Sequence, residues 1–212
     1  ALGEDPSVAG KAIYESIRKG QVGFLASGED FNYQDYPSDQ KLPVPKGDLF
    51  CRFREKSCIT SLMEEQTNIG DVLNSNQQLL ERYAKFSRLS DYATLTIPMV
   101  TEPLPPYHYL ATASRLIILK NINEAQTGNP KQAVNEILKS TANLRNLLAQ
   151  QDTLLGKLVL LTQISEHLDI AYLLSKNLNQ TLSINIPPLT SKEKDFEILM
   201  SREIAMSFNI FN

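Results

Sequence analysis

The sequence of 212 residues predicts a mainly α-helical protein: a bundle of about six helices with antiparallel hairpins and an irregular N-terminal region. Residues 46–97 and 131–186 contain no proline, which inside a helix removes an amide donor at a cost of about 3 kcal/mol. Apolar residues in both windows recur at intervals of three and four, as on one face of a helix. We therefore expect a single domain over residues 1–212, in which an irregular acidic region 1–50 packs on a helical body 51–212.

The first 50 residues are rich in turns and in acidic side chains. They hold six of the nine glycines and five basic against eight acidic residues, whereas residues 51–212 hold 16 of each. Pro6 suits the first position of a helix, and a short helix is expected from there to Lys19. Residues 20–50 are expected to be irregular, with a short strand at residues 22–25 as an alternative.

Residues 59–86 have the apolar spacing of helices, whereas residues 92–100 do not. Residues 59–86 predict one long helix or two in sequence, with a bend at Gly70 or at residues 74–76. Residues 92–100 are rich in β-forming side chains but run into Pro98 and a cluster of further prolines. They therefore predict an extended connector on the surface.

Two helices are expected over residues 106–126 and 131–150, joined by a short turn. Gly128 can take the left-handed conformation that ends a helix. Asn129 can cap the next helix with its side chain, and Pro130 fits its first position. Such a short turn makes the two helices antiparallel neighbours.

Residues 152–177 predict another long helix, and Thr190 with Glu193 has the spacing of a capping box that opens a last helix through Phe208. A membrane span needs about 20 nearly uncharged residues, and residues 154–174 come close. Four ionisable residues interrupt this run, however, and a charge near the bilayer centre costs roughly 2.5 to 3.5 kcal/mol. A buried core helix is therefore expected, with no membrane span in this chain.

The two ends leave the natural length of the protein open. The first residue is Ala1 and not a methionine, which a processed leader or a trimmed start would both explain. Residues 207–212 are apolar and end without a polar tail, so we expect the natural chain to continue. Membrane association is expected only through such missing termini.

The sequence contains two cysteines, Cys51 and Cys58. On one straight helix they would lie about 10 Å apart along the axis, beyond the roughly 7 Å that a disulfide allows. A disulfide thus requires Cys51 in the loop before the helix, and closing that loop would contribute roughly 2.5 kcal/mol. A redox pair or metal site lacks both a Cys-x-x-Cys spacing and nearby ligands. A disulfide predicts a periplasmic or secreted location, and two free thiols would predict a cytoplasmic one.

No catalytic motif is present: the sequence has no nucleophile elbow, no phosphate-binding loop and no zinc-protease motif. His108 is expected to be a surface ring beside two tyrosines. His167 and Asp169 could contribute to a metal site, but side chains two positions apart on a helix diverge. A solvated helix face is the preferred interpretation of His167. We assign no catalytic, cofactor-binding or metal-binding residue.

Ionic residues inside apolar helical stretches are the most informative feature. Arg115, Arg145, Lys157 and Glu203 each have apolar neighbours along the helix. The preferred interpretation is long side chains whose stems pack while their heads reach water. The alternative is a buried polar cluster that links these cations to Glu203 or Asp152, because buried charges must be paired. Such a cluster would form an anion-binding pocket.

Residues 116–148 resemble one helical hairpin of the tetratricopeptide type, with Gly128 and Ala133 at that family's spacing and GNPKQA as the turn. The segments LRNLLAQQDTLLGKLVLL and PPYHYLATASRLIIL resemble a set of uncharacterised exported or envelope proteins of proteobacteria. These resemblances imply a helical fold and an envelope location. They imply no activity and no site residue.

The sequence therefore favours a noncatalytic periplasmic or secreted protein that binds another protein or a peptide in a helical groove. The alternative is a small-molecule binder for anionic ligands, or a hydrolase, that uses Arg115, Arg145 and Lys157. A net charge of -3 disfavours nucleic acid as a partner, because nonspecific phosphate attraction needs an excess of cations. An electrostatic preference for a partner is expected in residues 1–50, where the net acidic charge lies.

Overall fold

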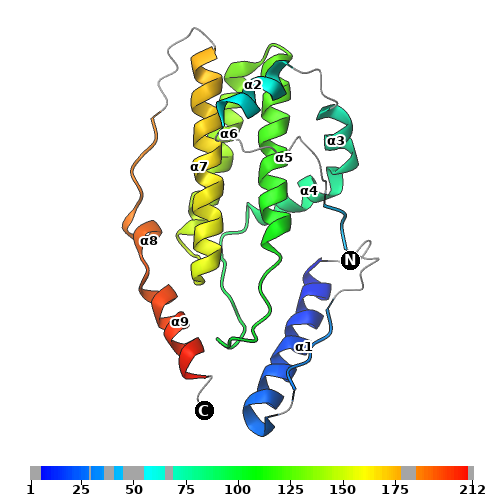
Figure 1. Cartoon of the computed structure of the whole chain (residues 1–212), viewed down its shortest axis with the longest axis vertical. Coiled ribbons are helices and arrows are strands. Elements are labelled where there is room, and N and C mark those ends of the chain that lie inside the picture. The colour runs from blue at the N-terminus through cyan, green and yellow to red at the C-terminus, as the bar shows by residue number, and fades with distance from the viewer. Residues whose placement is uncertain are drawn as a thin grey trace. The chain divides into compact units, whose positions relative to one another are not determined.

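The computed structural model is mainly α-helical, which confirms the predicted fold class (Figure 1). It describes residues 6–28, 30–35, 41–44, 55–64, 69–177 and 185–209. Its contacts divide the chain into two compact units, which we describe separately. The terminal unit comprises residues 1–43, 93–105 and 196–212, and the bundle unit comprises residues 44–92 and 106–195. The single domain over residues 1–212 stays a prediction.

Helices make up most of the described residues of both units, and these residues contain no β-strand. The terminal unit contains α1 (Pro6–Ser27) and α9 (Glu197–Phe208). The bundle unit contains α2 (Lys56–Glu64), α3 (Ile69–Ser75), α4 (Gln77–Phe86), α5 (Tyr107–Gln126), α6 (Pro130–Leu148), α7 (Leu154–Asn177) and α8 (Ser191–Lys194).

Helix α1 begins at Pro6, as predicted, but it continues to Ser27 and does not end near Lys19. The alternative strand at residues 22–25 is therefore wrong. The irregular segment expected over residues 20–50 is wrong up to Ser27, which ends α1, whereas residues 28, 30–35 and 41–44 have no regular secondary structure, as expected.

Gly20 shows why glycine is tolerated inside α1. A Cβ atom at this position would collide with the carbonyl oxygen of Asn32. The same segment approaches the helix at Gln34, whose backbone amide donates to the hydroxyl of Ser16 at 2.6 Å. Close packing of residues 30–35 on α1 thus offsets the roughly 1 kcal/mol by which glycine weakens a helix relative to alanine.

The connector of residues 93–105 is extended and irregular, as predicted for residues 92–100. Gln21 of α1 binds it with both ends of its side-chain amide. The amide nitrogen donates to the carbonyl oxygen of Ile97 at 2.8 Å, and the amide oxygen accepts from the backbone nitrogen of Ile97 at 2.9 Å. These bonds give the backbone N–H and C=O of Ile97 the hydrogen-bond partners that a neighbouring β-strand would have provided.

Helix α9 binds the same connector through polar side chains. Arg202 pairs with the carboxylate of Glu102, and both side chains are largely buried. Asn209, just after the helix, donates to the carbonyl oxygen of Pro98 at 2.8 Å. The terminal unit is therefore two helices attached to one extended segment.

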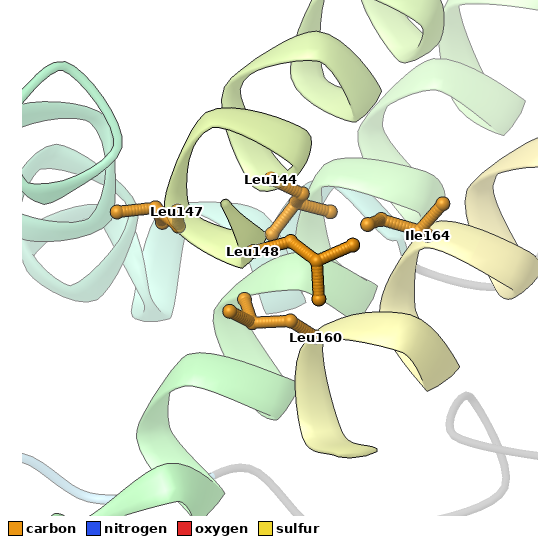
Figure 2. Close-up of a cluster of buried hydrophobic side chains, with 5 residues drawn as sticks. All are labelled: Leu144, Leu147, Leu148, Leu160 and Ile164. Carbon is orange, nitrogen blue, oxygen red and sulfur yellow. The ribbon is translucent and has the colours of Figure 1, made fainter. Parts of the chain in front are cut away.

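The core of the bundle unit lies among α5, α6 and α7, which contact one another pairwise. Figure 2 shows one cluster of this core, in which side chains of α6 and α7 meet. Its members are Leu144, Leu147, Leu148, Leu160 and Ile164. Burying each such side chain contributes roughly 1.5–3 kcal/mol.

The turn between α5 and α6 has the predicted Gly128 and Pro130. Gly128 has a φ of 100°, which disfavours any residue with a side chain, and Pro130 opens α6. Asn129 does not cap α6 with its side chain, so that prediction is wrong. Its amide donates to the carboxylate of Glu124 at 2.9 Å instead. The likeness of this hairpin to a tetratricopeptide unit stays a prediction.

The described part of residues 59–86 belongs to three helices, α2, α3 and α4, and not to the one or two that were expected. Gly70 lies inside α3, so the bend predicted there is wrong, but the bend predicted at residues 74–76 is present. α3 and α4 are separated at Asn76, whose side chain donates to the carbonyl oxygen of Val72 at 2.8 Å. Helix α7 matches the expected helix of residues 152–177. No helix in the described part of the chain is long and apolar enough to cross a membrane.

The last predicted helix is divided in two. The capping box of Thr190 and Glu193 is present, but α8 ends at Lys194 and the backbone of Asp195 is extended. Lys157 of α7 donates to the carbonyl oxygen of Asp195. This bond satisfies a carbonyl that a continuous helix would have used, so a tertiary contact accompanies the break.

Candidate functional site

Arg145 of α6 holds the segment that leads into α8. Its guanidinium pairs with the carboxylate of Glu193, with one nitrogen–oxygen distance of 2.9 Å. It also donates to the carbonyl oxygens of Pro187 at 2.7 Å and Pro188 at 2.8 Å. The pairing lowers the pKa of Glu193 to about 2, mainly through the hydrogen bond from Arg145. Most of the donors of this guanidinium are thus used inside the protein.

Lys157 of α7 is the largest fully buried side chain of the described residues, at 2% exposure. Its ammonium group donates to the carbonyl oxygen of Asp195. Burial lowers the pKa of Lys157, and the charge of Asp195 opposes this shift. The interpretation in which the head of this lysine reaches water is therefore wrong.

Arg115 of α5 and Glu203 complete the predicted cluster. Arg115 pairs with Glu166 of α7 at 2.8 Å. Glu203 lies on α9, in the terminal unit, so its pairing with these cations stays a prediction. Arg145 and Lys157 both bind the segment around α8, whereas Arg115 joins two long helices.

The bonds that Arg115, Arg145 and Lys157 form inside the protein oppose the binding of a ligand to these three cations. Each of the three cations already donates to an oxygen of the protein, either a carboxylate or a backbone carbonyl. An anionic ligand at these residues would have to displace bonds that are largely buried, at a cost of several kcal/mol. The described contacts of Arg115, Arg145 and Lys157 are those of structural side chains.

The sequence offered Glu193 only as part of a capping box and did not indicate its partner Arg145. The capping box requires the carboxylate to turn back toward the backbone of Thr190. That orientation leaves the other face of the carboxylate for a cation. The 48 positions between Arg145 and Glu193 explain why spacing along the chain could not predict the pair.

His167 is fully buried and not on a solvated helix face, so that prediction is wrong. Its Nε2 atom lies 2.9 Å from the hydroxyl of Ser114 on α5. Burial lowers the pKa of His167 to about 4, which keeps the ring neutral at ordinary pH. His108 is exposed and lies against Tyr109, with ring centroids 4.3 Å apart. No cluster of metal-ligating side chains occurs in the described residues.

Only one of the two predicted disulfide cysteines can be placed. Cys58 lies in α2 and is 6% exposed, whereas Cys51 lies outside the described residues. The bond between them stays a prediction.

The terminal unit exposes an unusual amount of apolar surface. Its described residues include twelve exposed large apolar side chains against five in the larger bundle unit. Ala9, Met99 and Leu199 are its buried apolar residues in the described part of the chain. A unit with so small a core and so many exposed apolar side chains is typical of one that binds another surface.

Four of these side chains recur every fourth position along α9 and its N-cap. They are Phe196, Met200, Ile204 and Phe208, with exposures of 42%, 50%, 52% and 64%. Residues four apart share one face of a helix, so they form a continuous row that we call the α9 stripe. Leu199 is buried, and Arg202 binds the connector.

The terminal unit is also acidic. Its sequence contains five basic and ten acidic residues, against 16 and 14 in the bundle unit. The acidity that the sequence placed in residues 1–50 thus belongs to the same unit as the α9 stripe.

Comparison of the chain with protein-family models, with curated proteins and with solved structures gives no match.

Proposed function

We propose that this chain is a noncatalytic envelope protein that binds another protein through the α9 stripe of its terminal unit. The observation that carries this proposal is the exposure of Phe196, Met200, Ile204 and Phe208 in one row. A helix in a soluble protein normally presents one apolar face to its core and a polar face to water. Helix α9 instead exposes this row of large apolar side chains in addition to its buried Leu199.

The charge of the terminal unit supports a particular kind of partner. With ten acidic and five basic residues, this unit repels a second copy of itself and attracts a basic surface. Anionic lipid surfaces are disfavoured for the same reason. The proposed partner is therefore a different protein with an apolar face bordered by Lys and Arg.

The α9 stripe can be tested with one substitution at its centre. Ile204→Asp places a charge in the row, and we expect it to weaken binding of the partner by at least about tenfold, since burying one such side chain is worth 1.5–3 kcal/mol. The partner would be captured from an envelope extract by a photo-crosslinker at Met200 and then titrated as a purified protein. Leu158→Asp, at an exposed position of the bundle unit, is the matched control.

Equal binding by the wild-type chain and the Ile204→Asp variant would refute the proposal. So would a purified chain that forms a dimer which Ile204→Asp dissociates, because the occupant of the stripe would then be a second copy. Circular dichroism of both variants must match that of the wild-type chain, since Ile204 is already exposed and its replacement should leave the fold intact.

The periplasmic or secreted location is part of the same proposal, and it depends on a disulfide between Cys51 and Cys58. We expect the intact mass of the chain, purified without reductant and treated with a thiol-alkylating reagent, to show no alkylation. Two alkylated cysteines in that sample would contradict the envelope location, and a sample reduced before alkylation is the control.

A further inference from the structure

The bundle unit contains a groove of about 430 Å³ among α4, α5 and α6. This volume lies within the range of sites for small ligands, roughly 300–1,000 Å³. The groove is separate from Arg115, Arg145 and Lys157, none of which lines it. It also belongs to a different unit from the α9 stripe.

Charged side chains in the groove are paired unevenly. Arg88 and Lys120 line it, and neither forms an ion pair within the part of the chain that the structure describes. Glu124 also lines the groove and accepts from the neutral amide of Asn129 at 2.9 Å, so it keeps its negative charge, and Glu136 lies 3.9 Å from Lys139. With Lys139, the lining holds three cations against two carboxylates, so its net charge is positive by one.

The groove also has uncharged side chains that can form hydrogen bonds. Ser140 and Asn143 line it, and Asn143 has no hydrogen bond among the described residues. Tyr83 also lines it and is 5% exposed, and Ser114 and Ser140 lie near its buried hydroxyl.

These groups can act together as donors. Burial raises the pKa of Tyr83 to about 12, so its hydroxyl stays protonated. The amide of Asn143 and the hydroxyl of Ser140 donate as well, and Arg88 and Lys120 donate with a full positive charge. Donors and cations in one groove match the oxygens of a carboxylate or phosphate.

We propose that the groove among α4, α5 and α6 binds a small molecule through an oxyanion, with Arg88 and Lys120 neutralising its charge and Ser140 and Asn143 donating to its oxygens. The bound class is a small carboxylate or phosphate compound.

Nuclear magnetic resonance of the full ¹⁵N-labelled chain tests this site. Inorganic phosphate is titrated in one series and succinate in another, at constant ionic strength set with chloride. We expect at least one of them to shift the signals of Ser140 and Asn143 in a saturable way. A response to both defines a general oxyanion site, and a response to one identifies the source as a phosphate or a carboxylate.

The Arg88→Gln, Lys120→Gln double variant should weaken this binding by at least about tenfold, because a hydrogen bond to a charged group contributes roughly 1.5–3 kcal/mol. The control is Lys85→Gln, Lys131→Gln, which removes two exposed cations of the same unit that do not line the groove. The proposal is overturned if neither anion gives saturable shifts, or if the control weakens binding as much as the groove variant.

Discussion

Replacing Arg145 with methionine is expected to lower the free energy of unfolding by roughly 3 kcal/mol. The substitution leaves the carboxylate of Glu193 at 4% exposure with no cation beside it. It also leaves the carbonyl oxygens of Pro187 and Pro188 without their donor. The cost thus comes from buried groups that lose their partners, and methionine retains most of the packing of the arginine stem.

Urea denaturation of the wild-type chain and the Arg145→Met variant at neutral pH measures this loss. Lys139→Met is the matched control on the same helix, because its pair with Glu136 is solvent-exposed and worth about 0.5 kcal/mol or less. Losses of equal size in both variants would contradict the assigned role of Arg145.

The pH dependence of this loss separates charge from packing. The pKa of Glu193 is lowered from 4.5 to about 2, mainly by Arg145 and in part by Thr190, so its contribution is complete above pH 4.5 and disappears as the pH falls toward 2. The variant lacks the part of this contribution that comes from Arg145. The difference between the two proteins should therefore shrink on acidification below pH 4.5, whereas a loss due to packing would not depend on pH.

Acidification from pH 6.5 to pH 4 is expected to destabilise the wild-type chain by roughly 3 kcal/mol through His167 alone. Burial lowers the pKa of this ring from 6.5 to about 4. Between these values the unfolded chain binds a proton that the folded chain does not. The stability contribution of neutral His167 is thus complete above pH 6.5 and is lost as the pH falls to 4.

Urea denaturation at a series of pH values tests this expectation. The decline between pH 6.5 and 4.5 precedes the range in which Glu193 takes up a proton, so the two groups can be told apart. His167→Gln should remove most of the slope in this range even if it lowers stability throughout. His108→Gln, at an exposed ring, should retain the slope, and a slope that survives in His167→Gln would refute the assignment.

The helices were predictable wherever their signals lie close together in the sequence. Gly128 and Pro130 define a turn by their own backbone geometry, and Thr190 and Glu193 form a capping box across three positions. These interactions involve neighbours in the chain, so their spacing is enough to recognise them.

The predicted helix boundaries are wrong where contacts between residues far apart in the sequence override the local preference for a helix or a loop. The carbonyl oxygen of Asn32 packs against Gly20, in the part of α1 that lies beyond its predicted end. The ammonium group of Lys157 donates to the carbonyl oxygen of Asp195, where the last predicted helix is divided. Neither contact leaves a pattern in the sequence, because each joins positions that only the folded chain brings together.

The candidate sites follow the same division. The sequence indicated that Arg145 and Lys157 lie among apolar neighbours and that residues 1–50 are acidic. Their partners Glu193 and Asp195 lie 48 and 38 positions away, and only packing identified them. The exposed α9 stripe was not predicted at all, since an apolar helix has the same sequence whether its face is covered or open.

By itself, then, the sequence determined a mainly helical fold, the principal turns and the location of net charge, because these depend on residue type and short-range spacing. The tertiary structure decided which charges are paired, that His167 is buried, and which apolar face of α9 remains open. These features depend on burial, and the burial of a side chain is set by all the elements packed around it and not by its neighbours in the chain.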